Sequence, residues 1–406
     1  AGIYPAAVLS SFLPSQVIKG IIKASFQGAV LRKGLVIFQF TLSIALIAGT
    51  TIVYNQLEHM RSVDMGFEQN QMLVIDYGYD GGVQSKIDLI KDEYEKMSFV
   101  TSVSATRTVP GGHFPKAGTS VETASGEMIN HAPNLYEVDF DFIEHFDIEV
   151  VAGRGYSREF PADTAKSMVI NQAAARLWGY PNPEDIIGKK FSQWGRDGRI
   201  IGVVKDFNYV SLHDQVEPLT LRLEPKWSTS FLALELKTTD FPAALNQIED
   251  TWKQVAPHRP FLYSFLDDSF NRQYQADVRF GKVFGVFAVL AIFIACLGLF
   301  GLAAWTAERR IKEIGIRRVL GASFAQIISL LSADFMKLVA VAIVIATPLA
   351  WYVMSRWLEG FAFQTEIRWW VFALAGLLAT VIALITVSFQ SAKAASMNPA
   401  KSLRSE

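Results

Sequence analysis

The sequence predicts an α-helical membrane protein with four transmembrane helices and a large extracytoplasmic α+β domain inserted between the first and second helices. Three observations lead to this fold class: four long stretches without charged residues, an acidic region between the first two stretches, and basic clusters that recur on one side of them. Half of the 406 residues are hydrophobic, and many of these lie in the four stretches.

The charge-free stretches cover residues 34–57, 283–307, 338–355 and 369–392. A helix needs about 20 apolar residues to cross the hydrocarbon layer, because it rises about 1.5 Å per residue and the layer is about 30 Å thick. The third stretch is shorter, but apolar turns extend it across Asp334 and Lys337. The alternative is a set of buried helices in a soluble protein. Such helices keep a polar stripe, which VFGVFAVLAIFIACLGLFGLAAWT lacks.

The charges predict the orientation in the membrane. Residues 58–282 carry 23 Lys/Arg and 33 Asp/Glu, a net charge of −10. The basic residues of the rest of the chain cluster within 19–33, 309–318 and 393–404, which four spans would place on one face. Cytoplasmic loops are rich in Lys and Arg, so these clusters are expected in the cytoplasm and residues 58–282 outside. An aromatic belt is expected at the outer interface, formed by Trp351, Tyr352, Trp357, Trp369 and Trp370.

These observations divide the chain into nine segments. They are a cytoplasmic tail with an amphipathic interfacial helix (1–33), transmembrane helix 1 (34–57), the extracytoplasmic domain (58–282), transmembrane helix 2 (283–307), a cytoplasmic elbow (308–324), transmembrane helix 3 (325–355), a short outer loop (356–368), transmembrane helix 4 (369–392) and a cytoplasmic tail (393–406). The interfacial helix would lie flat with Lys19 and Lys23 near anionic head groups, so membrane lipids are an expected partner. Packing on a partner protein is the open alternative.

The outer domain alternates between the two kinds of secondary structure. Strands are predicted at 72–76, 148–153, 199–204, 219–223, 231–236 and 261–266, and helices at 83–97, 171–178 and 241–255. This pattern predicts a mixed α+β domain, which could be split near residue 110 or 215.

The sequence contains no pattern that indicates a catalytic, metal-binding or nucleotide-binding site. It has no G-x-x-x-x-G-K-[ST], H-E-x-x-H or G-x-S-x-G motif, and its six histidines lack ligand spacing. The single Cys296 lies in the second span, which excludes a disulfide within the chain. The polar run 205–214 follows a predicted strand, and Asp267 and Asp268 would point to opposite faces of an extended segment. We therefore expect no enzyme activity, cofactor, metal or nucleic-acid partner.

The elbow between the second and third spans has the sequence AERRIKEIGIRRVLGASFAQ. Gly321 predicts a helix end, and Ser323 with Gln326 fits a capping box that begins the next helix. Apolar and charged positions do not separate onto two helical faces, which favours contact with another protein. A basic loop that only sets the topology is the alternative.

The residues ERRIKEIGIRRVLGAS resemble the signature of FtsX/MacB-type ABC transporter permeases, which follows the second span in that family. The order of one span, a large outer domain and three further spans is similar to that family as well. VINQAAARLWGYPNPEDIIGKKF and GVVKDFNYVSLHDQVEPL resemble parts of the MacB-like periplasmic core domain, and the four spans resemble the FtsX-like transmembrane domain. The opening AGIYPAAVLSSF is similar to the Pro-Ala-x-x-Leu ending of such permeases, so we expect the C-terminal half of a tandem permease.

The resemblance implies the permease subunit of an ABC transporter for export, efflux or extracytoplasmic release, in a bacterial inner membrane. ATP would be bound and hydrolysed by a separate cytoplasmic ABC ATPase, whose motion the permease transmits outward, and a second permease copy or tandem half would complete the transporter. The alternative functions are a membrane-anchored extracytoplasmic sensor and a regulator of cell division or cell-wall hydrolases. The residues implied to couple to the ATPase are Glu308, Arg309, Arg310, Glu313, Ile314, Gly315, Ile316, Arg317, Arg318, Leu320, Gly321 and Ala322.

Overall fold

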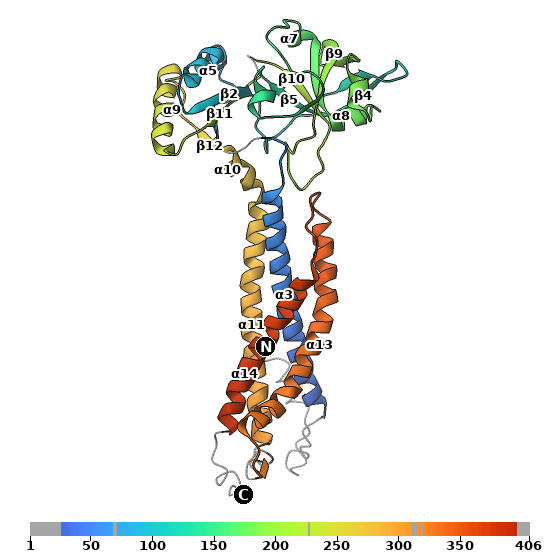
Figure 1. Ribbon diagram of the computed structural model, residues 1–406, viewed down its shortest axis with the longest axis vertical. Helices are drawn as coiled ribbons and strands as arrows, with labels where there is room; N and C mark the ends of the chain where they lie inside the picture. Colours follow the sequence, from blue (N-terminus) through green and yellow to red (C-terminus); the bar gives the residue numbers. More distant parts are fainter. Residues whose placement is uncertain are drawn as a thin grey trace, which may run out of the picture. The chain divides into compact units, whose positions relative to one another are not determined.

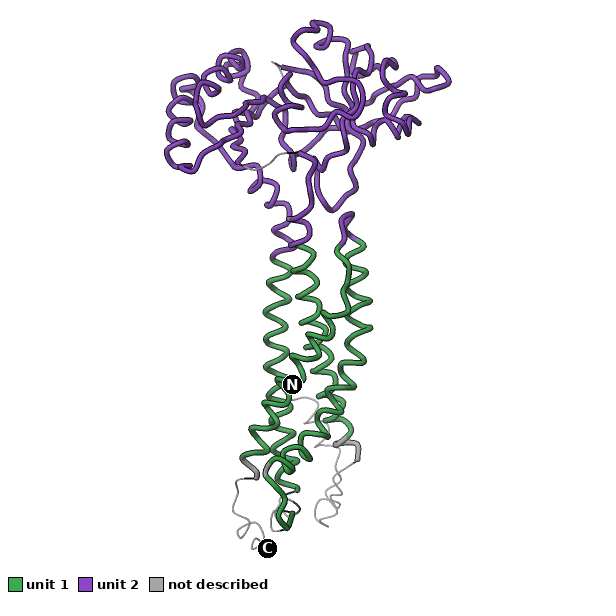
Figure 2. The backbone as a smooth tube through the Cα atoms, viewed as in Figure 1, with its two compact units in different colours: residues 1–57, 279–359, 365–406 green, residues 58–278, 360–364 purple. Residues whose placement is uncertain are grey.

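The computed structural model describes residues 26–67, 71–225, 228–310, 313, 316–317 and 320–395. The chain forms two compact units, which Figure 2 shows in different colours. The membrane unit comprises Ala1–Leu57, Arg279–Glu359 and Thr365–Glu406, and the outer unit comprises Glu58–Val278 and Gly360–Gln364. Three predicted features lie outside the described residues. They are the interfacial helix with Lys19 and Lys23, the opening segment AGIYPAAVLSSF, and most of the C-terminal tail.

Among its described residues, the membrane unit contains four long helices (Figure 1): α3 (Phe26–Ser62), α11 (Gln275–Arg309), α13 (Phe324–Leu358) and α14 (Trp369–Ala395). Each is long and apolar enough to cross a membrane. The predicted fold class is confirmed, because four such helices are present and a mixed α+β domain is inserted between the first and second. The helices extend beyond the charge-free stretches, since α3 continues to Ser62 and α11 already begins at Gln275.

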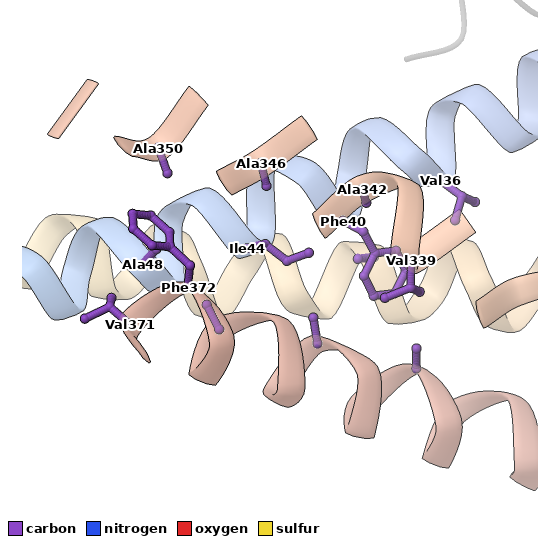
Figure 3. Packing of buried hydrophobic residues seen from close by; sticks show 14 of the residues in the cluster. Val36, Phe40, Ile44, Ala48, Val339, Ala342, Ala346, Ala350, Val371 and Phe372 are labelled. Atoms are coloured by element: carbon purple, nitrogen blue, oxygen red, sulfur yellow. The ribbon is translucent and has the colours of Figure 1, made fainter. Parts of the chain in front are cut away.

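Small residues line the buried centre of the membrane unit. Ala342, Ala346 and Ala350 are spaced by four residues on α13, and the buried alanines of α14 are Ala375, Ala379 and Ala383. Figure 3 shows the α13 alanines together with the larger side chains of α3, such as Phe40 and Ile44. Membrane helices associate through such positions, because small side chains let backbones approach closely.

Glycines give α11 the same kind of contact with α3. A Cβ atom added at Gly281 would lie 3.1 Å from Val53 Cγ1, and one at Gly298 would lie 2.5 Å from the Gln39 side-chain oxygen. A larger residue at either position would therefore require the opposing side chain to move.

The outer unit is built on one 12-stranded sheet with the order β12-β1-β11-β2-β5-β10-β7-β9-β8-β3-β4, and β6 pairs with β9. The strands are β1 (Met72–Asp76), β2 (Val100–Thr106), β3 (Thr119–Glu122), β4 (Met128–His131), β5 (Asn134–Val138), β6 (Val150–Gly153), β7 (Ser167–Asn171), β8 (Lys190–Gln193), β9 (Arg196–Val204), β10 (Leu219–Leu223), β11 (Phe231–Leu236) and β12 (Tyr263–Phe265). The helices are α4 (Gly81–Gln84), α5 (Ile87–Glu95), α6 (Phe142–His145), α7 (Asp163–Lys166), α8 (Gln172–Leu177), α9 (Phe241–Val255) and α10 (Leu266–Asn271), with short 3-10 helices at Pro183–Ile186 and Arg272–Tyr274.

The sheet has two lobes with separate hydrophobic cores. Strands β12, β1, β11 and β2 pack with α5 and α9 around Trp252, whereas β7, β8, β9 and α8 surround Ile170 and Trp178. Strands β2 and β5 connect the lobes through one registered pair, Thr106 with Val138. The chain leaves the first lobe after β2 and returns to it with β11.

Several predicted elements differ from the observed ones. The predicted helix 83–97 is two helices, α4 and α5, and the predicted strand 261–266 is reduced to β12 because α10 begins at Leu266. Asp267 and Asp268 therefore lie in the first helical turn rather than on an extended segment, which corrects the geometry expected for them. Six strands were not predicted: β2, β3, β4, β5, β7 and β8.

Candidate coupling elbow and outer joint

The cytoplasmic elbow follows the end of α11 at Arg309. Gly321 has φ +93°, a left-handed conformation that glycine adopts without strain, and the Ala322 amide donates to the Arg317 carbonyl at 2.9 Å. The predicted capping box at the start of α13 is confirmed, because the Gln326 amide donates to Ser323 Oγ at 3.3 Å and the Ser323 amide donates to Gln326 Oε1 at 2.9 Å.

Two large aliphatic side chains of the elbow are exposed. Ile316 is 54% and Leu320 81% exposed, and the Leu320 amide donates to the Ile316 carbonyl at 3.0 Å, so the two lie one helical turn apart. Beside them Arg317 pairs with Glu313 at 2.8 Å. Exposed aliphatic side chains among charges suit a surface that contacts another protein.

The described part of the elbow includes nine of the residues expected to couple to the ATPase: Glu308, Arg309, Arg310, Glu313, Ile316, Arg317, Leu320, Gly321 and Ala322. Ile314, Gly315 and Arg318 lie outside the described residues.

An ionic cluster joins the base of the elbow to α13. Arg310 donates to Asp334 Oδ2 at 3.2 Å, and Lys337 Nζ lies 3.5 Å from Asp334 Oδ1. Arg310 and Lys337 therefore share the single carboxylate of Asp334.

The outer joint is a cluster around His213 in the outer unit. The His213 ring stacks on Phe361, with ring centroids 4.5 Å apart, and on Tyr274, with centroids 5.6 Å apart. Its Nε2 lies 3.1 Å from Asp277 Oδ2, and the Ala362 amide donates to the His213 carbonyl at 2.9 Å. The joint thus connects the 205–214 segment to the start of α11 and to the loop between α13 and α14.

The polar groups that could have suggested catalysis have structural roles. Asp206 accepts a hydrogen bond from the Ala173 amide at 2.8 Å and pairs with Arg176, so it caps and anchors α8. Asp267 and Asp268 are exposed at the start of α10, where the helix dipole favours carboxylates. Among the described residues, no group of three His, Cys, Asp or Glu side chains is arranged to hold a metal ion.

The first lobe contains a buried ionic cluster between α5 and the segment after β5. Lys91 Nζ lies 2.5 Å from both Asp139 Oδ2 and Asp141 Oδ2, and Lys91 and Asp139 are almost fully buried. Burial alone would lower the pKa of Lys91, but the two carboxylates raise it above its usual value. Burial would raise the pKa of Asp141, but hydrogen bonds from Arg158 together with Lys91 lower it to about 2. Lys91 and Asp141 therefore stay ionised, and their pairing connects α5 to the segment after β5.

His145 is buried next to this cluster. Its Nδ1 lies 2.8 Å from Ser102 Oγ and its Nε2 3.1 Å from Met72 Sδ. Burial, together with the positive charge of Lys91, lowers the pKa of His145 to about 3, so the imidazole is neutral at physiological pH.

Comparison with known proteins identifies the membrane unit. Residues 285–399 match the family FtsX-like permease, C-terminal. These residues form an FtsX-like permease C-terminal region. The resemblance seen in the elbow sequence is confirmed, and the chain is a multi-pass membrane protein with an extracytoplasmic domain, as the charges predicted. A comparison with curated proteins finds no match.

Solved structures similar to this chain include three separate domains. The periplasmic region of MacB from Actinobacillus actinomycetemcomitans is 14% identical with a TM-score of 0.35, over 50% of this chain and 92% of that one. A domain named as part of a permease protein from Porphyromonas gingivalis is 16% identical with a TM-score of 0.33, over 46% and 85%. The extracellular domain of the noncanonic ABC-type transporter YknZ from Gram-positive bacteria is 12% identical with a TM-score of 0.31, over 48% and 98%.

The sequence located the elbow of this permease but not the outer joint. The elbow is a continuous motif with its own helix stop and cap, so local patterns mark it. The joint combines His213 with Tyr274 and Phe361, which are distant in the sequence. Its members resemble ordinary surface and loop residues until the fold brings them together.

Proposed function

We propose that this permease is the membrane subunit of an ABC transporter and that its elbow docks on a separate cytoplasmic ATPase. The exposure of Ile316 and Leu320 carries the proposal. Burying two large aliphatic side chains in a partner would contribute about 1.5–3 kcal/mol each. Arg317, which follows Ile316 in the chain, suits an acidic group on that partner.

The helix α11 would transmit the motion of the ATPase. It runs without interruption for 35 residues from Gln275 to Arg309, which corresponds to a length of about 52 Å. One end leads into the elbow, and the other lies next to the outer joint through Asp277. A stiff helix of this kind moves as one body, so displacement at the elbow reaches the outer unit.

The membrane unit is better suited to transmitting motion than to carrying a polar solute. Residues 283–307 of α11 carry no ionisable side chain apart from the Cys296 thiol, and carriers of ions or polar solutes normally place charged groups inside the membrane. We therefore place the work of this permease, efflux or release of a substrate, at the outer unit. The proposal includes a second permease unit that packs against α11. The most apolar part of this helix is only 17% buried within the chain, so most of its surface is free to contact such a unit.

The test compares two leucine variants of the full chain. Leu320→Asp should abolish co-purification with the ATPase encoded with the permease, and with it the stimulation of ATP hydrolysis by the reconstituted permease. Leu89→Asp, which changes an exposed leucine of α5 in the outer unit, is the matched control and should leave both unchanged. Unaltered ATPase binding by Leu320→Asp would refute the docking role and favour the membrane-anchored sensor.

A further inference from the structure

The cytoplasmic ends of three membrane helices enclose a cavity of about 260 Å³. Its walls come from the first turns of α3, the last turns of α11 and the first half of α13. Along the chain, α3 leads into the outer unit at its C-terminal end and α11 leaves that unit at its N-terminal end. The cavity is formed at the other ends of these two helices, so it lies at the inner leaflet of the membrane.

Positive charge dominates this cavity. Arg32, Lys33, Arg309 and Arg310 line it, against the single carboxylate of Asp334. Asp334 is already shared between Arg310 at 3.2 Å and Lys337 at 3.5 Å. No carboxylate in the described part of the chain forms an ion pair with Arg32, Lys33 or Arg309. Three cations therefore remain for an anion from outside the chain.

Trp305 gathers two of these cations around one ring. The Arg32 guanidinium carbon lies 4.4 Å and that of Arg309 4.1 Å from the ring centroid, and the two residues come from different helices. The ring attracts each guanidinium, whereas the like charges repel each other. An anion that accepts hydrogen bonds from both would relieve that repulsion, and a phosphate has the geometry to do so.

Apart from Thr306, the rest of the lining is apolar. Phe335 is buried, and Leu302 and Leu338 are half-buried. Tryptophan itself favours the membrane–water interface. A ligand that fits this cavity has an anionic head and a hydrocarbon portion beside it.

We propose that the cavity formed by α3, α11 and α13 binds the phosphate of an anionic phospholipid of the inner leaflet, with an acyl chain along Leu302 and Leu338. Basic pockets between membrane helices on the cytoplasmic side are suited to such head groups. The cavity shares Arg309 and Arg310 with the residues expected to couple to the ATPase, so lipid binding is measured on the permease without the ATPase.

Lipid binding to the full chain tests the site by native mass spectrometry with phosphatidylglycerol and phosphatidylcholine as probes. Wild type should prefer phosphatidylglycerol, and R32Q/R309Q should lose that preference by at least tenfold while phosphatidylcholine binding is unchanged. The matched control R356Q/R368Q removes two arginines near the other end of the same unit and should bind as wild type does. Equal losses in both double variants, or no preference in wild type, would overturn the proposal.

Two further measurements separate the lipid from a free anion and test the role of Trp305. Inorganic phosphate at millimolar concentration should not displace the lipid; displacement would assign the cavity to a free anion instead. Trp305→Leu keeps the apolar lining and removes the ring that holds both guanidinium groups, so it should weaken phosphatidylglycerol binding even if R32Q/R309Q fails to fold. Wild-type binding by Trp305→Leu would overturn the stated geometry.

Discussion

The two units of this permease are packed in opposite ways. The outer unit buries many large side chains, such as Trp252, Tyr94 and Tyr136, whereas the membrane unit buries rows of alanine and exposes large residues such as Phe287 and Phe293. In water, burying large apolar groups drives folding. In lipid that driving force between helices is lost, so close approach and van der Waals packing matter more. A large buried side chain therefore stabilises the outer unit, whereas small buried side chains stabilise the membrane unit by letting its helices approach closely.

The two units also differ in where they place their charged side chains. The outer unit buries the ion pair of Lys91 with Asp139 in its interior, where the Ala105 amide also donates to Asp139. In the membrane unit, Asp334 and its partners lie toward the helix ends.

The largest effect is expected from Lys91→Met in the outer unit. This variant leaves Asp139 buried without its cation, which should cost about 3–5 kcal/mol. Hydrogen exchange of β2 and α5 in the full chain should accelerate accordingly. Lys96→Met removes an exposed pair with Glu93 and should change nothing measurable. Equal protection in the two variants would contradict a stabilising role for the buried cluster.

In the membrane unit, Ala346→Leu should cost about 1–3 kcal/mol, because extra methylene groups do not fit at a fully buried position. Val344→Leu adds bulk to the same helix at a position that is 72% exposed, and lipid accommodates it. Thermal unfolding of the full chain in detergent should show a lower midpoint for Ala346→Leu alone. A similar drop for Val344→Leu would mean that this face also packs against protein.

The next prediction is that the stability of the outer unit depends on pH through His145. The pKa of His145 is about 3 in the folded state and about 6.5 when unfolded, so the unfolded chain binds the extra proton between these values. Stability is therefore complete above pH 6.5 and falls as the pH drops, by on the order of 2 kcal/mol at pH 5. Hydrogen exchange of β1 and β2 at pH 7 and 5, corrected for intrinsic rates, measures it.

His145→Gln removes the group that titrates and should reduce this pH dependence. His113→Gln replaces an exposed histidine and should retain it. The same loss of protection at pH 5 in His145→Gln and wild type would show that another group is responsible.

Local chemistry explains which parts of this fold the sequence predicts. The four membrane helices follow from uninterrupted apolar length, and the cap of α13 from Ser323 and Gln326 alone. Strands β5 and β7 were not predicted because each contains polar residues that the sequence alone would place at the surface. Asn134 and Glu137 in β5 and Asn171 in β7 are nevertheless buried, since partners from other segments cover them. The elbow was predictable as a motif, but the exposure of Leu320 depends on the fold around it.

The outer joint has a consequence for how the protein is made. Synthesis runs from the N-terminus, so residues 58–278 emerge before the loop that carries Phe361. His213 and Asp277 are in place early, but the stacking of Phe361 on His213 has to wait until α13 has been threaded into the bilayer. The joint therefore closes only after α13 has crossed the bilayer, whereas α14 still follows Phe361 in the chain.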